Sequence, residues 1–428
     1  MSRRRIGCVA GLVLGWAIGA AWGQAAMPVS APEAQDDGGC PSFNSSTPSA
    51  SSDRCKSSQR GQNAADGGKH FLLTFGSVGG YDSAFNARQN LSAYFEGGMA
   101  YAGLLYQRPN SLTLVENTAS LMNYEVANGI TEYMNSTGVS LERMPSQRTT
   151  LSFDATNVFG NDAIRILTLG NQDVDQISYG IHSGRVFGNQ ATARLTRQST
   201  RARWWQISVR NNFRNFIDDE MSVNTFHARA EIQYQPSARA GIGLFEETSI
   251  ETGAVGCSSQ SLGLVYERRF SHKLAAETAV APAVGTKQCI DKLSANLYGA
   301  LSAQPWTSTS LYVSAFRKLN DSAFSAITYE NNVQGGWTQK FGLRTWVSAR
   351  AGWLGGTAPL HVEHFSAHYY SGSVARKLLA GLSANIEFQQ FHWSGIANVS
   401  PTRTILVGSL TWSPSGKTPE DLHSPMTH

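Results

Sequence analysis

Charged side chains are scarce in this chain of 428 residues. Asp, Glu, Lys and Arg together make up 15% of it, against about 25% in typical soluble domains. The mean hydropathy is nevertheless −0.25, so much of the remainder is polar without being charged. The formal net charge of +4 comes with no dense basic tract, which argues against nucleic acid as a partner.

The usual catalytic motifs are also missing. The chain contains no G-x-S-x-G, no H-E-x-x-H and no phosphate-binding loop, so we expect neither an enzyme nor a bound cofactor. The densest histidine cluster consists of His361, Glu363, His364 and His368. A strand would place the first two on one face and the last two on the other, so they could converge on a metal only in a loop. We therefore expect no metal site.

A long apolar run occurs only near the N-terminus. Residues 1–26 contain three arginines, an apolar run from Ile6 to Trp22 and a zone of small residues. This pattern predicts a signal peptide. An uncleaved anchor helix is the alternative, although the run is shorter than the roughly 20 apolar residues that a spanning helix needs. No later segment is long and apolar enough to span, so the exported chain is either soluble or a β-barrel.

Cysteine is rare, with five residues in the whole chain. Cys8 lies in the expected signal peptide, and the others form two local pairs, Cys40 with Cys55 and Cys257 with Cys289. An even number of cysteines in an exported chain favours disulfides over a metal site.

Two terminal segments lack the large apolar residues that a core requires. Residues 27–68 are rich in Ser, Gly, Ala, Pro, Asp and Gln, which predicts a disordered periplasmic linker. Residues 413–428 contain three prolines among scattered charges and are interpreted as a C-terminal tail. The expected domain is therefore 69–412.

Within 69–412 apolar and polar residues alternate with a period of two. Every second residue from Phe226 to Tyr234 is apolar, and the residues between them are polar; the same holds in 293–303 and 382–389. These alternations last for about 9–12 residues, which matches tilted membrane strands and exceeds the soluble average of about 5–6.

Short polar breaks punctuate this region at nearly constant spacing. They lie near Pro109, Pro145, Ser199, Pro236, His272, Pro305, Gly342 and Arg376, so that successive breaks are 36, 54, 37, 36, 33, 37 and 34 residues apart. A spacing of about 35 residues holds two long strands, one tight turn and one longer loop. We therefore predict an all-β fold, a closed antiparallel up-and-down transmembrane β-barrel. It should have about 18 strands (roughly 16–20), with both of its ends on the tight-turn side.

Aromatic residues cluster beside these breaks. Such residues prefer the boundary between water and lipid, so we expect a girdle at the tight-turn rim; the alternative is a general preference of aromatics for strands. The expected girdle residues are Tyr106, Trp204, Tyr234, Phe270, Trp306, Phe341 and Trp412.

The second cysteine pair fits the predicted register. Cys257 and Cys289 flank the predicted hairpin 261–283, at nearly equal distances from its turn. An antiparallel hairpin returns such positions to the same height. We predict a disulfide between two loops on the long-loop side.

Two short motifs resemble outer-membrane β-barrel porins of Gram-negative bacteria, a largely uncharacterised family. The first is Gly79-Gly80-Tyr81-Asp82-Ser83-Ala84-Phe85-Asn86 and the second is Gln235-Pro236-Ser237-Ala238-Arg239. The resemblance extends over roughly 70–412, but the chain departs from many barrels in the tail that follows Trp412. It implies a pore or an export channel without catalytic residues.

The longest interval between breaks places a third long loop at residues 159–189. In general porins, which this pattern resembles, the third loop narrows the pore. We accordingly expect Asp162, Asp173 and Asp175 to face inward arginines across a constriction, while an outward surface loop remains equally open. The expected arginines are Arg229, Arg269 and Arg350.

The function favoured by the sequence is an outer-membrane channel for the diffusion or export of small hydrophilic solutes. The alternative is a non-conducting envelope scaffold or a partner barrel in exopolysaccharide export. Both charge signs occur at the predicted inward positions, so no strong ion selectivity is expected. The expected partners are outer-membrane lipid, the barrel-assembly machinery and small solutes. The sequence does not decide whether the protein forms a homo-oligomer.

Overall fold

The structure is a computed structural model, and it describes thirteen stretches of the chain. These are residues 68–86, 91–126, 129–162, 183–200, 202–218, 220–237, 239–253, 256–271, 273–286, 294–321, 327–357, 364–394 and 402–415. The expected signal peptide, almost all of the expected linker and most of the expected tail lie outside these stretches. Within them, no helix is both long and apolar enough to cross a bilayer.

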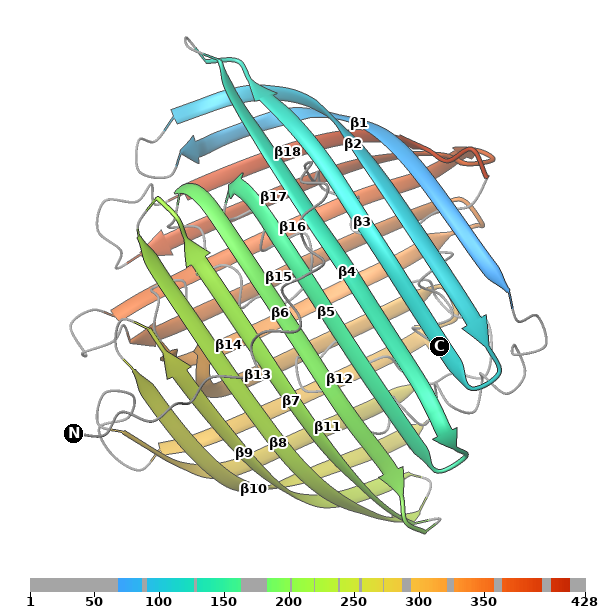
Figure 1. Cartoon of the computed structure of the whole chain (residues 1–428), viewed down its shortest axis with the longest axis vertical. Helices are drawn as coiled ribbons and strands as arrows, with labels where there is room; N and C mark the ends of the chain where they lie inside the picture. The colour runs from blue at the N-terminus through green and yellow to red at the C-terminus, as the bar shows by residue number, and fades with distance from the viewer. Residues whose placement is uncertain are drawn as a thin grey trace, which may run out of the picture.

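The described residues form eighteen antiparallel strands in one closed sheet, which confirms the predicted fold class (Figure 1). Each strand pairs with its neighbours in sequence, and β1 pairs with both β2 and β18. The bounds are β1 Lys69–Asn86, β2 Leu91–Arg108, β3 Ser111–Tyr124, β4 Ile130–Ser146, β5 Thr149–Asp162, β6 Ser183–Gln198, β7 Arg203–Phe216, β8 Met221–Ser237, β9 Ala240–Thr252, β10 Cys257–Ser271, β11 Leu274–Gly285, β12 Ser294–Trp306, β13 Thr309–Asp321, β14 Ile327–Phe341, β15 Thr345–Thr357, β16 His364–Leu379, β17 Leu382–Ser394 and β18 Thr402–Trp412.

The shortest turns lie at one rim, as predicted from the spacing of the polar breaks. The β14–β15 and β16–β17 turns contain Gly342 and Gly381, whose φ angles of 65° and 73° lie in the left-handed region that favours glycine. The start of β1 and the end of β18 belong to this same rim, because Phe75 pairs with Trp412. Outer-membrane barrels keep their short turns in the periplasm.

Several strands continue farther on the long-loop side than the sequence predicts. The loop expected over 159–189 is shorter in the structure than the sequence predicts, because β5 continues to Asp162 and β6 begins at Ser183. Both extensions belong to one ladder, in which Asp162 pairs with Ser183. Backbone pairing continues for as long as a partner strand is present, whereas side-chain alternation reports only the part that has two different faces.

The barrel has an apolar outer face and a mostly polar inner face. Ile232 and Leu262 point outward and are 65% and 63% exposed, whereas Glu231 and Ser261, their neighbours along the strands, point inward and are buried. Exposed apolar patches of this extent do not occur on a water-soluble protein. Lipid chains are the medium that suits this outer face.

The prediction is wrong for one residue of the aromatic girdle. Trp204 points into the barrel and is only 1% exposed, while Trp205 points outward beside Arg197 and Ile232. The tandem tryptophans differ by one position, and one position reverses the face of a strand. Tyr234, Phe270, Trp306, Phe341 and Trp412 are exposed as expected.

A row of amides crosses the outer face at mid-height on strands β3 to β6. Asn117, Thr137, Asn157 and Asn189 are direct register neighbours. The Asn117 amide nitrogen donates to Thr137 Oγ1 at 2.9 Å, and the Asn189 amide donates to Asn157 Oδ1 at 2.5 Å. These side chains satisfy one another, which lowers the cost of facing lipid.

Candidate functional site: the barrel lumen

The inner face of strands β4 to β6 carries hydroxyl, amide and charged groups that retain access to solvent. Asp154 is its most exposed carboxylate, and its register partners are Ser140 on β4 and Thr192 on β6. Ser152 and Thr156 flank it along β5 and are half-buried. We call these five residues the hydroxyl strip. Groups of this kind can replace the hydration shell of a polar solute one hydrogen bond at a time.

A charged network covers the neighbouring part of the lumen wall. The Arg229 guanidinium on β8 donates to Glu231 Oε2 at 2.7 Å and lies 3.6 Å from Glu247 on β9. Its charged carbon also lies 4.1 Å from the centre of the Phe245 ring. The network therefore holds Arg229 between two carboxylates and an aromatic face, where its orientation is fixed.

The network continues through Gln233 to β10. The Gln233 amide donates to Glu231 at 2.6 Å and to Glu267 at 3.1 Å, although β9 lies between these strands. The bridge passes over Gly243, where an added Cβ would come within 2.5 Å of Gln233 Cγ and 2.8 Å of the Ile232 carbonyl oxygen. Glycine at this position is what allows the side chain to cross a strand.

Other polar contacts join neighbouring strands in the same region. Glu267 lies directly opposite Glu277 on β11, and both carboxylates are buried. His227 Nδ1 and Ser249 Oγ lie 2.7 Å apart across β8 and β9. This contact links two neighbouring strands of the lumen wall.

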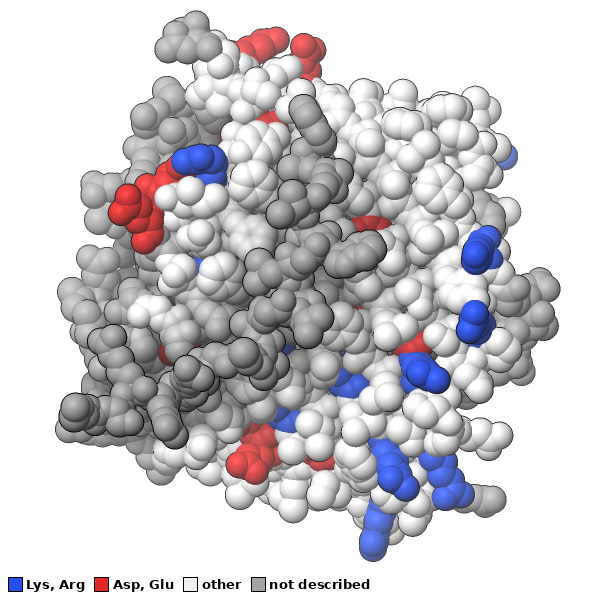
Figure 2. Space-filling model, viewed as in Figure 1, with Lys and Arg blue, Asp and Glu red and all other residues white. Residues whose placement is uncertain are grey.

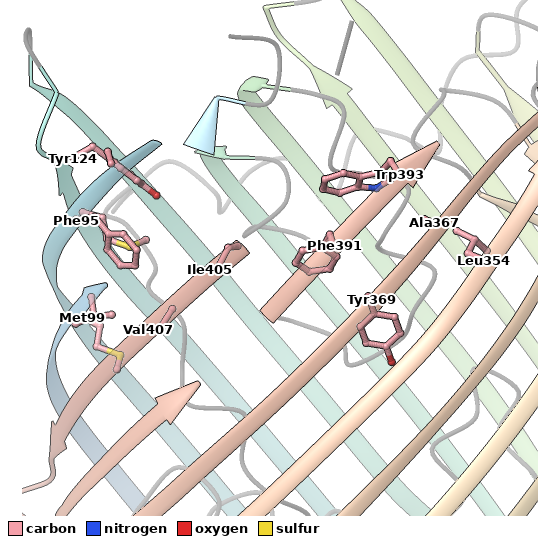
Figure 3. Close-up of a cluster of buried hydrophobic side chains, with 13 residues drawn as sticks. Phe95, Met99, Tyr124, Leu354, Ala367, Tyr369, Phe391, Trp393, Ile405 and Val407 are labelled. Carbon is pink, nitrogen blue, oxygen red and sulfur yellow. The ribbon is translucent and has the colours of Figure 1, made fainter. Parts of the chain in front are cut away.

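Part of the lumen wall on strands β15 to β3 is apolar and closely packed (Figure 3). One cluster of buried side chains includes Phe95 on β2, Tyr369 on β16 and Trp393 on β17. The Phe391 and Trp393 rings stack with centroids 5.7 Å apart. We call this cluster the apolar sector; other inward residues of the same strands, such as Arg350 on β15 and Glu387 on β17, are polar, and the polar sector begins at β4.

A closed sheet of eighteen strands with lipid-compatible side chains outside and charged side chains inside has one established setting. The protein is an outer-membrane β-barrel. This conclusion confirms the expected localisation. It rests on the strand count and on the reversed distribution of polarity.

Comparisons with known proteins add little to this assignment. No family model matches the chain and no curated relative matches it. Among solved structures it is similar to Pseudomonas aeruginosa OpdQ, with 10% identity, coverage of 80% of this chain and 98% of that one, and a TM-score of 0.43. Pseudomonas aeruginosa OccK7 (OpdD) is 12% identical, the match covers 82% of this chain and 100% of that one, and the TM-score is 0.44. Pseudomonas aeruginosa OpdK, in a structure with vanillate, is 11% identical, with coverage of 80% of this chain and 98% of that one and a TM-score of 0.43. Such distant likenesses carry no conclusion about the function of this chain.

The structure places the predicted constriction residues only in part. Arg229, Arg269 and Arg350 lie on the inner face of β8, β10 and β15, since each pairs in register with other inward residues. They stand on different parts of the wall, and the carboxylates recorded beside Arg229 are Glu231 and Glu247. Asp162 ends β5. Asp173 and Asp175 lie outside the described residues, so the constriction stays a prediction.

Most of the remaining predicted site residues lie outside the described residues. Cys257 opens β10 and is buried, whereas Cys40, Cys55 and Cys289 lie outside the described residues. His368 points outward, and its ring stacks on His392 at 6.5 Å. His361 and Glu363 are not described. In the described stretches, no three His, Cys, Asp or Glu side chains are grouped as metal ligands would be.

Two relationships in the lumen were missed by the sequence analysis. One is the apolar sector, in which residues such as Tyr94 and Phe95 are consecutive and both apolar, so alternation gives no sign of the inner face. The other is the Gln233–Glu267 bridge across β9. The sequence carries one signal for this bridge, the repeated glycines at positions 241 and 243.

Proposed function

We propose that this protein is a passive outer-membrane channel for small hydrophilic solutes. The observation that supports it best is the hydroxyl strip, a partly exposed polar wall inside a closed barrel of eighteen strands. Barrels of about 16–18 strands are wide enough for an aqueous channel. Carboxylates and guanidinium groups alternate along the polar sector, so the channel should pass neutral and zwitterionic solutes without strong preference for either ion sign.

A non-conducting scaffold, or a partner barrel in exopolysaccharide export, is the second candidate. The apolar sector favours it, because Phe95, Tyr369 and Trp393 face inward and are almost wholly buried. A lumen packed along one side leaves less space for a solute. The two candidates differ in whether the isolated barrel is permeable.

Liposome swelling distinguishes them. We expect vesicles that contain the folded full-length protein to swell in small sugars and amino acids, at rates that fall with solute size. Vesicles with equal amounts of folded protein but no swelling would support the scaffold. Folding is checked separately by heat-modifiable migration on a gel, so that an empty result cannot come from misfolded protein.

We propose further that the loop between β5 and β6 narrows the pore. The described strand bounds leave 163–182 for this loop, and it includes Asp173 and Asp175. Deletion of 164–181 should raise single-channel conductance if the loop lies in the lumen. Unchanged conductance would mean that the loop lies outside it.

We also propose the remaining features on the basis of the sequence. They are a signal peptide over 1–26, a periplasmic linker over 27–68, a tail over 413–428 and insertion by the barrel-assembly machinery. A disulfide between Cys257 and Cys289 is also proposed, because these residues flank the β10–β11 hairpin at nearly equal distances from its turn. A shift in the mass of the peptide that carries Cys289 on reduction tests this pairing. No enzymatic activity and no cofactor are proposed, and self-association is left to measurement of mass in detergent.

A further inference from the structure

The tight-turn rim of the barrel is basic and carries no carboxylate near its turns. Each tight turn except the one between β12 and β13 has an Arg or Lys within three residues, and no Asp or Glu lies that close to any of them. Figure 2 shows the blue side chains gathered along this rim of the facing wall. Acidic groups lie at the opposite rim, as with Glu125 after β3 and Asp218 after β7. The described turns of the tight-turn rim therefore carry a net positive charge.

A defined pocket interrupts the basic rim. It lies between the β4–β5 and β6–β7 turns and has a volume of about 280 Å³. Its lining includes Arg148, Arg197, Trp205, Ser146 and Thr149. We call it the rim pocket.

The fold brings the two arginines of the rim pocket to the same lining. Thr149, Arg197 and Trp205 are direct register neighbours on the outer side of β5, β6 and β7. The Gln198 amide nitrogen donates to the Arg148 carbonyl oxygen at 2.8 Å, which holds the β4–β5 turn against β6. Ser146 Oγ and Thr149 Oγ1 lie 3.0 Å apart, and Ser146 Oγ also accepts from the Arg148 amide. The pocket is therefore built by regular pairing and by its own turn.

The charge of the rim pocket has no counterpart in the described part of the chain. No carboxylate is recorded against the guanidinium of Arg148 or Arg197 among the described residues. Two like charges that share a pocket repel each other, and an anion between them relieves this repulsion. Guanidinium groups bind phosphate oxygens through paired hydrogen bonds, and nearby hydroxyls can donate further ones.

The apolar side of the rim pocket indicates where the anion comes from. Trp205 is half-buried at the boundary where indole rings prefer to lie. Ile232 lies beside it on β8, Ile207 lies two positions farther along β7, and both are exposed on the lipid-facing side. A ligand held here would thus have its phosphate at the arginines and an apolar part along the barrel wall. A phospholipid has both parts, whereas free phosphate has only one.

We propose that the rim pocket binds the headgroup of an anionic phospholipid from the periplasmic leaflet. Arg148 and Arg197 hold the phosphodiester, Ser146 and Thr149 donate to its oxygens or to the headgroup, and an acyl chain lies along Trp205 and Ile232. Anionic lipid is favoured over zwitterionic lipid because the rim itself is positive. This site is independent of whether the lumen conducts.

Native mass spectrometry of the full-length protein tests the proposal. The protein is titrated in detergent with phosphatidylglycerol, with phosphatidylcholine and with glycerol 3-phosphate. We expect phosphatidylglycerol to bind more tightly than phosphatidylcholine, and the double variant R148Q/R197Q to weaken its binding by about tenfold or more, given the usual contribution of a basic residue beside anionic lipid. Heat-modifiable migration confirms that each variant is folded.

The matched control is R344Q/R376Q, which removes two rim cations, one in the β14–β15 turn and one on β16, that do not line the pocket. Equal weakening in both double variants would show general attraction to the rim and would overturn the pocket. Unchanged binding in R148Q/R197Q would overturn it as well. Binding of glycerol 3-phosphate as tightly as phosphatidylglycerol would assign the pocket to free phosphate esters and reject the lipid.

Discussion

The Arg403 guanidinium on β18 forms a bidentate ion pair with the Asp82 carboxylate on β1, and these residues are 321 positions apart in sequence. Nε lies 2.9 Å from Oδ1 and Nη2 lies 2.5 Å from Oδ2. The Asp82 and Arg403 side chains are 0% and 2% exposed. The pair joins the first and last strands at the point where the barrel closes.

Loss of one partner of this pair should destabilise the barrel. Asp82→Asn leaves a buried guanidinium without its carboxylate, which typically costs about 3–5 kcal/mol. We expect a clearly lower urea midpoint of unfolding in detergent, followed by tryptophan fluorescence. The double variant Asp82→Asn/Arg403→Gln should recover part of the loss.

The exposed pair Arg185–Asp218 provides the control, because its side chains are 53% and 41% exposed. Asp218→Asn should change the midpoint far less, as exposed ion pairs contribute little. An Asp82→Asn variant as stable as Asp218→Asn would show that the seam does not depend on this ion pair.

Glycine at position 243 should be needed for the bridge across β9. In Gly243→Ala the new Cβ would meet Gln233 Cγ, the Ile232 carbonyl oxygen and Val265 Cγ1, all within 2.9 Å. We expect a loss of about 1–3 kcal/mol in the free energy of unfolding from overpacking. Gly188→Ala on the inner face of β6 meets nothing within 4 Å and should be neutral. Equal stability of both variants would contradict the described crossing.

The hydroxyl strip should influence which ions pass. Asp154→Lys replaces an exposed inward carboxylate with a cation, so the reversal potential in a salt gradient should shift toward anion preference. Glu96→Lys makes the same change of charge on the outer face of β2, where Glu96 pairs with Gly79 and Asn123. It should leave the reversal potential unchanged. Equal shifts in both variants would mean that Asp154 does not face the conducting path.

The Asp218 carboxylate should titrate below its ordinary pKa. Its hydrogen bonds to the Arg185 side chain, and then to the Arg185 backbone amide, lower the pKa of this group from 3.8. The amide donates to Oδ2 at 2.6 Å, so its chemical shift in NMR spectra reports the protonation. A lowered pKa in the folded state stabilises the loop above the unfolded pKa, and this contribution is lost as pH falls through the folded value.

We expect the chemical shift of the Arg185 amide to follow the titration of the Asp218 carboxylate, with a midpoint below 3.8. The titration should disappear in Asp218→Asn. A midpoint at or above the ordinary value would show that the Arg185–Asp218 contact does not persist in solution.

The sequence predicts the architecture of this barrel well because its signals are local. Period-two alternation identifies strands such as 223–235, and regular polar breaks identify the tight turns. Both arise within a few dozen residues. They are sufficient to predict eighteen strands and the inward faces of Arg229, Arg269 and Arg350.

Features that depend on pairing between distant strands could not be predicted in this way. The Asp82–Arg403 pair needs the closed register, and Asp82 stands in the motif that resembles porins without any sign of its partner. Trp204 and Trp205 needed the register to decide which one points inward. The amide row requires four strands to be aligned before Asn117 and Asn189 belong to one feature.

Single-channel recording in a planar lipid bilayer tests the proposed channel most directly. Purified full-length protein that shows heat-modifiable migration is added to one side at constant voltage. We expect discrete, long-lived conductance steps of uniform size, with little preference between cations and anions. A silent bilayer, with insertion of the folded protein verified independently, would contradict an open lumen and would favour the non-conducting scaffold.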